Sequence, residues 1–187
     1  MNQILDVAEQ MFIAEGYGAA TTNAIAARAK VPIGSLYQFF PDKGAIVAAL
    51  AMRYTEQLHQ RFMELETADL NNLPLSVYID RIIDTTSQFF TDYPGYYAIF
   101  MQVQGTVPEL EEIENASDAQ LIQDFSTSLS RYYSGLDDND YGAIAFVLVK
   151  SIGTLLWLSL GQGTSFQQRL VTETKRFTLN YLQSYFP

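Results

Sequence analysis

The amino-acid sequence predicts an all-α fold, with an N-terminal three-helix head (residues 1–48) followed by a C-terminal helical bundle (residues 49–187). Apolar residues recur along the whole chain at the three- and four-residue spacing of a helix face. Proline, glycine and capping residues separate these stretches, and no alternating strand pattern is longer than four residues. Of the 187 residues, 48% are apolar and 13% aromatic, which is enough to fill globular cores.

Three short helices are expected in the head. The first covers residues 2–15, and Gly16 follows it where helices often end in a left-handed residue. Thr21 and Thr22 can cap the second helix, and Pro32 suits the first turn of the third. The predicted inner faces consist of apolar side chains: Ile4, Leu5, Ala8, Met11 and Phe12, then Ile25, Ala26 and Ala29, then Leu36 and Phe39, with Phe40 as a further candidate.

Six further helices are expected after the Pro41-Asp42 break. Asp42 caps the first of them, and Ser165 with Gln168 resembles a capping box for the last. The expected ranges, in order, are 42–65, 74–92, 96–104, 109–133, 141–160 and 166–186.

Residues 141–160 are apolar on all faces and long enough to cross a bilayer. Lys150 lies in the middle of this stretch, and a central lysine costs about 2.5–3.5 kcal/mol on insertion scales. A helix buried in a protein–protein core is also apolar all round. We therefore interpret the stretch as a buried helix and expect no membrane partner. Because no signal-peptide pattern follows Met1, a cytoplasmic location is expected.

Residue usage argues against most catalytic and metal chemistry. The chain has no cysteine, which excludes disulfides, thiolate metal sites and cysteine nucleophiles. His59 is the single histidine, which argues against a histidine metal centre or a histidine-dependent triad. The sequence therefore predicts no enzyme, no catalytic residue, no metal site and no cofactor.

The net charge of −10 is unevenly distributed. Residues 1–61 carry five Lys/Arg and five Asp/Glu, whereas the rest of the chain carries six Lys/Arg and sixteen Asp/Glu. A neutral head on an acidic body indicates two parts with different partners.

The head has the arrangement of a helix-turn-helix, in which the third helix lies in the major groove of DNA. The exposed face of that helix carries small, polar and aromatic residues: Ile33, Gly34, Ser35, Tyr37 and Gln38. Gln38 can bond an adenine edge, and Ser35 can reach bases or phosphate. Tyr37 offers a phenol to a phosphate, and Lys43 beside a helix N-terminus forms an anion site.

Residues 4–50, ILDVAEQMFIAEGYGAATTNAIAARAKVPIGSLYQFFPDKGAIVAAL, resemble the tetracycline-repressor (TetR) family of bacterial transcriptional regulators. The family's landmarks fall in register at Phe12, Gly16, Tyr17, Thr21, Thr22, Ile25, Ala26, Ala29, Val31, Gly34, Ser35, Leu36, Tyr37, Phe40 and Lys43. The rest of the chain agrees in length and helicity with that family's divergent ligand-binding, dimerising domain. The resemblance implies that Thr22, Tyr37 and Lys43 hold phosphates. It also implies residues at or near the bases: Asn23, Ile33, Ser35, Gln38 and Phe39.

Three departures from the family pattern are visible. Lys30 stands where the family usually has a glycine, and a left-handed lysine costs about 1 kcal/mol, which its ammonium could offset by binding DNA. Pro32 replaces the usual serine or threonine cap, and the basic tail that commonly precedes the first helix is absent from this sequence. We therefore expect weaker DNA binding that depends more on dimerisation.

Aromatic residues are frequent in the acidic body and can line a cavity between helices. The candidate lining residues, each of which also suits a plain core, are Tyr93, Tyr97, Phe100, Met101, Phe125 and Trp157. The expected small-molecule effector is apolar or aromatic, and a nearby Asp84 or Asp124 would favour a cation.

The last two helices are the expected homodimer surface, because pairing them with a second copy makes a four-helix bundle. A two-fold dimer spaces two recognition helices about 34–36 Å apart, which matches a palindromic double-stranded DNA operator. The sequence thus predicts a ligand-responsive repressor. The alternative is a helical protein-interaction module without DNA binding.

Overall fold

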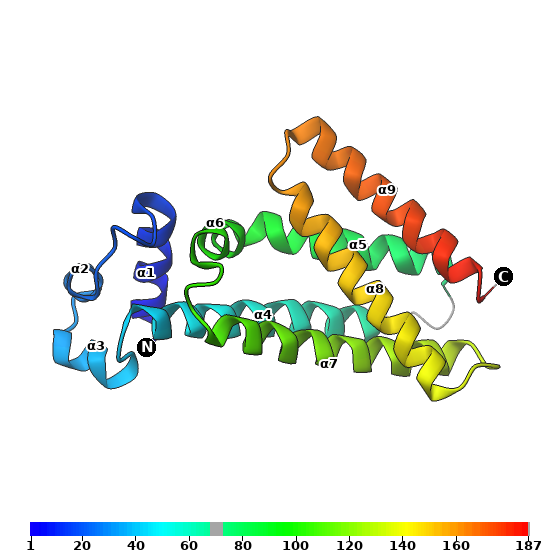
Figure 1. Cartoon of the computed structure of the whole chain (residues 1–187), viewed down its shortest axis with the longest axis horizontal. Coiled ribbons are helices and arrows are strands. Elements are labelled where there is room, and N and C mark those ends of the chain that lie inside the picture. Colours follow the sequence, from blue (N-terminus) through cyan, green and yellow to red (C-terminus); the bar gives the residue numbers. More distant parts are fainter. Residues whose placement is uncertain (68–72, 187) are drawn as a thin grey trace. The chain divides into compact units, whose positions relative to one another are not determined.

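The computed structural model describes residues 1–67 and 73–186, and over these residues it has nine helices and no strand (Figure 1), which confirms the all-α prediction. The helices are α1 Asn2–Glu15, α2 Thr22–Arg28, α3 Ile33–Phe39, α4 Lys43–Thr67, α5 Leu75–Asp92, α6 Pro94–Val103, α7 Glu109–Tyr132, α8 Asp138–Ser159 and α9 Thr164–Gln183.

Side-chain caps fix the start of three helices, as local sequence rules predict. The Ala24 N–H donates to Thr21 Oγ1 (3.2 Å) at the start of α2. At the start of α4, Asp42 Oδ1 accepts a hydrogen bond from the N–H of Ala45 (2.8 Å). Asp137 Oδ1 accepts from the N–H of Asp140 (2.9 Å), so α8 begins three residues before its expected start.

Two local predictions are wrong. The capping box of Ser165 does not form, because α9 begins earlier, at Thr164, with Gly163 as an extended N-cap that makes no side-chain bond. Phe39 does not lie on the inner face of α3, because its side chain is 53% exposed. The chain leaves the helix at Phe40 in an extended conformation (φ −135°), which directs the Phe40 ring into the core instead.

The helices form two compact units. The first unit comprises Met1–Glu56 with Asp92–Glu114, and the second comprises Gln57–Thr91 with Asn115–Pro187. The helix α6 therefore packs with the N-terminal helices, mainly with α1, although 35 residues of the second unit separate it from residue 56. The division of the chain at residue 48 stays a prediction.

The core of the first unit is built from one apolar face of each helix, with α1 and α4 as the largest contributors. Its largest fully buried side chains are Met11, Phe12, Ile25, Leu36, Ile46, Leu50, Tyr54 and Ile99. Tyr54 lies among three aromatic rings, with edge-to-face centroid distances of 5.4 to 6.1 Å to Tyr96, Tyr93 and Phe100. Edge-to-face packing of this kind stabilises a core beyond its area burial.

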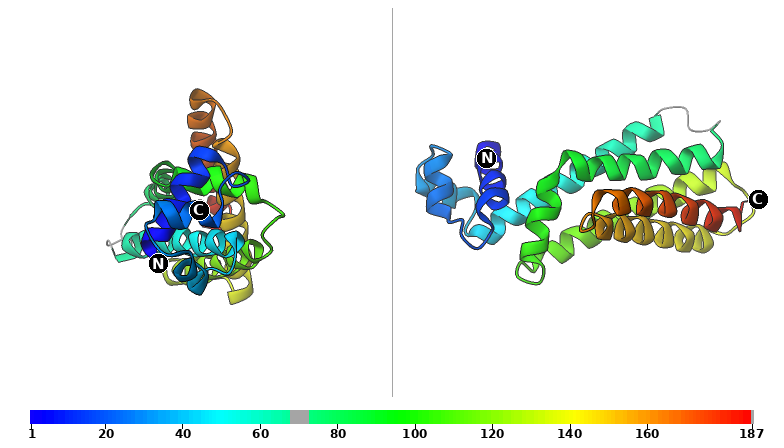
Figure 2. Two further views of the ribbon diagram at one scale, coloured as in Figure 1. Left: turned by 90° about the vertical axis from the view of Figure 1, so that its left-hand side faces the viewer. Right: turned by 90° about the horizontal axis from the view of Figure 1, so that it is seen from above.

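In the second unit, α8 and α9 lie side by side as an antiparallel pair (Figures 1 and 2). By length and hydropathy α8 is the one described helix that could cross a membrane, a test that core helices of soluble proteins also pass. Its buried residues face the core of the unit, and Lys150 pairs with Asp118 of α7. This packing favours a core helix over a membrane span.

Candidate functional site

The turn between α2 and α3 contains Lys30 in the left-handed region (φ 54°), and no other non-glycine residue of the described chain has a positive φ. The Lys30 N–H donates to the Ala27 carbonyl (3.1 Å), and the Val31 N–H donates to the Ala26 carbonyl (3.0 Å). These two bonds close the end of α2. Both form because Lys30 has a left-handed backbone conformation, which turns the chain back toward the helix. The expectation that a lysine occupies this strained position is confirmed.

The helix α3 presents an outward face that the unit does not use for packing. Leu36 is fully buried beneath it, whereas the outward side chains of Ile33, Tyr37 and Phe39 are 38%, 48% and 53% exposed. Gln38 is also exposed, and Ser35 is half-buried. A Cβ added at Gly34 would meet no atom within 4 Å, so this glycine leaves the backbone of α3 open to an approaching surface.

Thr22 and Tyr37 meet at one end of this face. The Thr22 hydroxyl lies 3.0 Å from the Tyr37 hydroxyl, and the pair joins the first residue of α2 to α3. Asn23 follows on α2 and is exposed. Two of the three residues expected to hold phosphates therefore lie together, next to a residue expected near the bases.

Lys43, the third expected phosphate contact, is bound to the chain itself. Its Nζ donates to the carbonyls of Tyr17 and Ala20 (2.9 Å for Ala20) and lies 4.1 Å from the centroid of the Tyr17 ring. Desolvation lowers the pKa of Lys43 and raises that of Tyr17. Lys43 thus holds the loop between α1 and α2, and these two hydrogen bonds use two of its three ammonium protons.

The charges of the first unit identify a residue that the site prediction did not include. The unit has four Lys/Arg against ten Asp/Glu. Arg28 pairs with Glu15 (2.8 Å), Arg53 pairs with Asp6 (2.6 Å) and Glu9, and Lys43 is bound as above. Lys30 is exposed, and its side chain makes no ion pair with the residues that the structure describes. The departure of Lys30 from the family glycine was the signal that could have found it.

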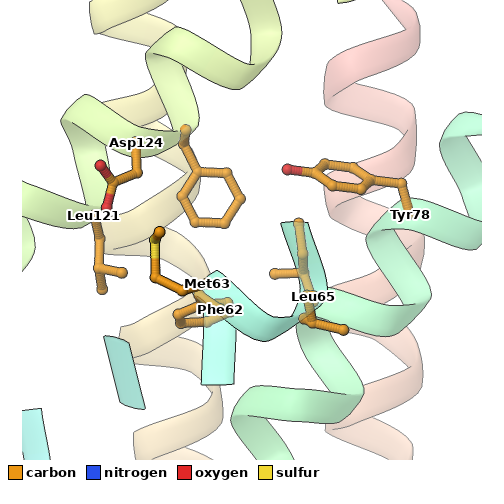
Figure 3. Close-up of a pocket in the computed structure, with 8 residues that line it drawn as sticks. Phe62, Met63, Leu65, Tyr78, Leu121 and Asp124 are labelled. Atoms are coloured by element: carbon orange, nitrogen blue, oxygen red, sulfur yellow. The ribbon is translucent and has the colours of Figure 1, made fainter. Parts of the chain in front are cut away.

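A cavity lies in the second unit, between α4, α5 and α7 (Figure 3). Its lining residues are mostly apolar: Phe62, Met63, Leu65, Tyr78, Ile82, Leu121, Asp124 and Phe125. About 340 Å³ is free of atoms, including space open to solvent, while the enclosed part admits little more than a water molecule. The Tyr78 hydroxyl and the Asp124 carboxylate lie on opposite sides of this space (Figure 3).

Of the six residues expected to line a ligand cavity, only Phe125 lines this one. Tyr93, Tyr97, Phe100 and Met101 belong to the first unit. Tyr93 and Phe100 pack on Tyr54, and Met101 is 48% exposed. Trp157 belongs to the second unit and packs on Phe90, with ring centroids 6.2 Å apart.

The sequence prediction did not include the cavity residues of α4, namely Phe62, Met63 and Leu65. Their apolar spacing on the long helix was the available signal, but it equally fits a plain core face. Asp124 was recognised as a candidate partner for a cation, and the structure places it in the lining.

Comparison with known proteins gives two family matches. Residues 4–50 match the family model described as "Bacterial regulatory proteins, tetR family". Residues 74–182, more than half of the chain, match "Tetracyclin repressor-like, C-terminal domain".

Curated relatives and solved structures agree with these matches. Two uncharacterized HTH-type transcriptional regulators of Bacillus subtilis (strain 168) are similar in sequence. YxaF is 32% identical over 46% of this chain and 45% of its own length. YuxN is 21% identical over 61% of this chain and 38% of its own length. The matched part of this chain thus spans less than half the length of either relative.

A TetR-family transcriptional regulator from Streptomyces coelicolor has the same fold, with a TM-score of 0.69, 25% identity and coverage of 98% of this chain and 97% of that one. A transcriptional regulator from Cytophaga hutchinsonii shares the fold with a TM-score of 0.73 at 15% identity, and the match covers 98% of this chain and 96% of that one. From both family matches, together with the helix-turn-helix geometry, the chain belongs to the tetR family of bacterial regulatory proteins, a family of DNA-binding transcriptional regulators rather than enzymes.

Proposed function

We propose that this chain acts in the cytoplasm as a homodimeric repressor that binds a palindromic operator and releases it when a small apolar or aromatic molecule binds the second unit. The observation that carries this proposal is the outward face of α3. It exposes Ile33, Tyr37 and Phe39 to solvent, while Leu36 beneath them is fully buried. An uncharged helix face with both apolar and polar side chains, which the fold does not cover, fits the major groove, where base edges and thymine methyl groups are exposed.

In the proposed docking, α3 lies in the major groove with its outward face against the bases. Residues at the bases are Asn23, Ile33, Ser35, Gln38 and Phe39, and Gly34 lets the helix backbone come close. Thr22 and Tyr37 bond one phosphate from their shared hydroxyl pair, and Lys43 bonds another with its remaining ammonium proton. The uncovered ammonium of Lys30 adds a phosphate contact that offsets the acidic charge of the unit.

The proposed dimer forms through α8 and α9. Large apolar side chains remain exposed on these two helices: Phe146, Leu158, Phe166, Phe177 and Tyr185, at 45–59% exposure. Pairing α8 and α9 with their two-fold mates covers such residues in a four-helix bundle. The resulting symmetry is the symmetry of a palindromic operator.

The proposed effector site is the cavity between α4, α5 and α7. Because α4 contributes residues to both compact units, a ligand that moves its C-terminal half also acts on the helix that begins at Lys43. Effector and operator then favour different conformers, and each weakens the binding of the other by the same factor.

Selection of bound sequences from a random DNA pool at low salt tests the proposal. The wild-type protein is expected to enrich a palindrome, and Gln38→Ala is expected to alter the preference at one base position of each half-site. Glu111→Ala is the matched control, because Glu111 is exposed on α7 and distant in sequence from the recognition helix. If the wild type enriches no sequence and shows no salt-dependent binding, a protein-interaction module replaces the repressor.

A further inference from the structure

The cavity of the second unit has one charged lining residue. Seven of its eight lining residues have apolar or aromatic side chains, and the eighth is Asp124. The rings of Phe62 and Phe125 stand edge to face, with centroids 5.9 Å apart. A carboxylate beside aromatic rings distinguishes this cavity from a plain gap in an apolar core.

Only one of the two carboxylate oxygens of Asp124 accepts a hydrogen bond from the described chain. Its Oδ1 accepts a hydrogen bond from the Gln120 amide (2.9 Å). Its Oδ2 is buried and has no hydrogen-bond partner in the described chain. His59 Nδ1 is 3.5 Å from that oxygen, which is ion-pair distance when the imidazole is protonated, but the two buried atoms make no hydrogen bond with each other. A buried carboxylate oxygen without a donor destabilises the unliganded state, so a ligand that donates to it gains that free energy.

We propose that this cavity binds an organic cation, with an ammonium group at Asp124 Oδ2 and an apolar body between Phe62, Phe125 and the neighbouring aliphatic side chains. This inference rests on the proposed effector role of the cavity and narrows the proposed effector to an aromatic molecule that carries an ammonium group. The carboxylate attracts a cation and repels an anion, and the negative faces of the aromatic rings also favour a cation.

The charge of the surrounding unit supports the same class of ligand. The second unit carries seven Lys/Arg and eleven Asp/Glu, so its net charge is −4. A negative field raises the local concentration of small cations and lowers that of anions.

Side chains on α4 provide room for the ligand. Met63 is 45% exposed at the cavity, and its unbranched, flexible side chain can change rotamer at low cost. Phe62 is half-buried on the same helical turn. Movement of these two side chains widens the space without disturbing the fully buried core.

The test is isothermal titration of the full-length protein at pH 7 with three ligands of one shape: 4-phenylbutylammonium, 4-phenylbutan-1-ol and 4-phenylbutanoate. The expected order of affinity is ammonium, alcohol, carboxylate, with about a tenfold step from ammonium to alcohol. In Asp124→Asn the ammonium is expected to lose that tenfold advantage, while the affinity for the alcohol stays within about twofold. Asp84→Asn is the matched control, since it removes the same charge from an exposed carboxylate that pairs with Lys175 (2.7 Å).

The order of the three ligand affinities for the wild-type protein tests the inference even if a variant fails to fold. Equal binding of the ammonium and the alcohol, tighter binding of the carboxylate, or no binding of the ammonium at millimolar concentration overturns it. Loss of the ammonium preference in Asp84→Asn rather than Asp124→Asn also overturns it.

Adding the same three ligands to the protein–DNA complex separates this inference from the proposed function. If the ammonium binds at Asp124 but does not release DNA, the cation site stands and the effector role fails. If the alcohol or the carboxylate releases DNA and the ammonium does not, the effector role stands and the cation assignment fails.

Discussion

The hydroxyl groups of Thr22 and Tyr37 lie 3.0 Å apart, so the first residue of α2 and the outward tyrosine of α3 are hydrogen-bonded to each other. A hydrogen bond between the two hydroxyl groups restrains both side chains and lowers the entropy lost when a phosphate binds them.

Tyr37→Phe keeps the ring and removes the hydroxyl. The pair is exposed, so the free energy of unfolding is expected to fall by only about 0.5–1 kcal/mol. The affinity for DNA is expected to fall about tenfold, equally for specific and non-specific DNA, because phosphate contacts carry no sequence information. Fluorescence anisotropy with both DNAs measures this, and Tyr185→Phe on α9 is the control. An unchanged affinity would remove Tyr37 from the phosphate contacts.

Lys30→Gly and Lys30→Ala separate backbone strain from charge. The glycine variant is expected to be more stable than the wild type by about 0.5–1 kcal/mol, because it relieves the left-handed lysine (φ 54°). The alanine variant keeps the strain and should not gain that stability. Both variants are expected to weaken DNA binding and to lower the slope of log affinity against log salt by about one.

Urea denaturation and salt titrations of DNA binding measure these two effects of the Lys30 variants. A salt slope that stays at the wild-type value in both variants would show that the Lys30 ammonium does not contact DNA.

Gly95→Ala tests the close packing of α6 in the first unit. A Cβ at this position would lie 2.5 Å from the Tyr54 hydroxyl oxygen and 2.7 Å from Glu9 Oε1, which are hydrogen-bonded to each other. The variant is expected to lose about 1–3 kcal/mol of stability in thermal or urea unfolding. Gly142→Ala is the control, because a Cβ there meets nothing within 4 Å and alanine favours the helix. Equal stability of the two variants would contradict the packing.

Stability is expected to decrease above pH 10 through Tyr54. Burial, followed by its bond to Glu9, raises the pKa of Tyr54 well above the value of 10 that it has when unfolded. The unfolded chain therefore loses the phenol proton first, and the folded state is destabilised progressively as the pH rises. One such group accounts for about 1.4 kcal/mol between pH 8 and pH 11.

The measurement is urea denaturation of the wild type and of Tyr54→Phe across that range of pH. The variant is expected to start less stable, because it lacks the bond to Glu9, but to lose less stability as the pH rises. Parallel pH dependences in the two proteins would exclude Tyr54 as the source.

Leu158→Arg is expected to convert the dimer to a monomer. Leu158 is 59% exposed on α8, where the proposed partner copy covers it, and an arginine there would be buried without a partner. Light scattering after size-exclusion chromatography measures the mass. Val77→Arg on α5, at 36% exposure, is the control and is expected to stay dimeric. A wild-type mass equal to one chain would contradict the proposed dimer.

The fold was predictable where short-range chemistry decides it. Thr21, Asp42 and Asp137 each begin a helix by bonding an N–H three residues ahead, and that rule operates within one turn. The choice between Phe39 and Phe40 was not predictable, since it depends on the extended backbone at the end of α3.

The candidate cavity was harder to predict because its walls come from three helices that are distant in sequence. The half-satisfied carboxylate of Asp124 depends on Gln120, His59 and the packing of α4 against α7. Aromatic content alone could not distinguish Trp157, which packs on Phe90, from Phe125, which lines the cavity. The sequence shows that Lys30 replaces the family glycine. Only the structure shows that Arg28, Lys43 and Arg53 are bound to other groups, whereas the Lys30 ammonium makes no ion pair with the described residues.

The contact between α1 and α6 has a consequence for the order of events during synthesis. Tyr17 donates its N–H to Gln102 Oε1 (2.8 Å), and residues 92–114 complete a unit whose other part ends at residue 56. At about 5–20 residues per second, the ribosome makes the 47 residues from residue 57 to the end of α6 at Val103 in about 2–9 seconds. During that interval the face of α1 that α6 covers is exposed on the nascent chain. The N-terminal unit therefore reaches its final packing only after translation has passed the middle of the chain.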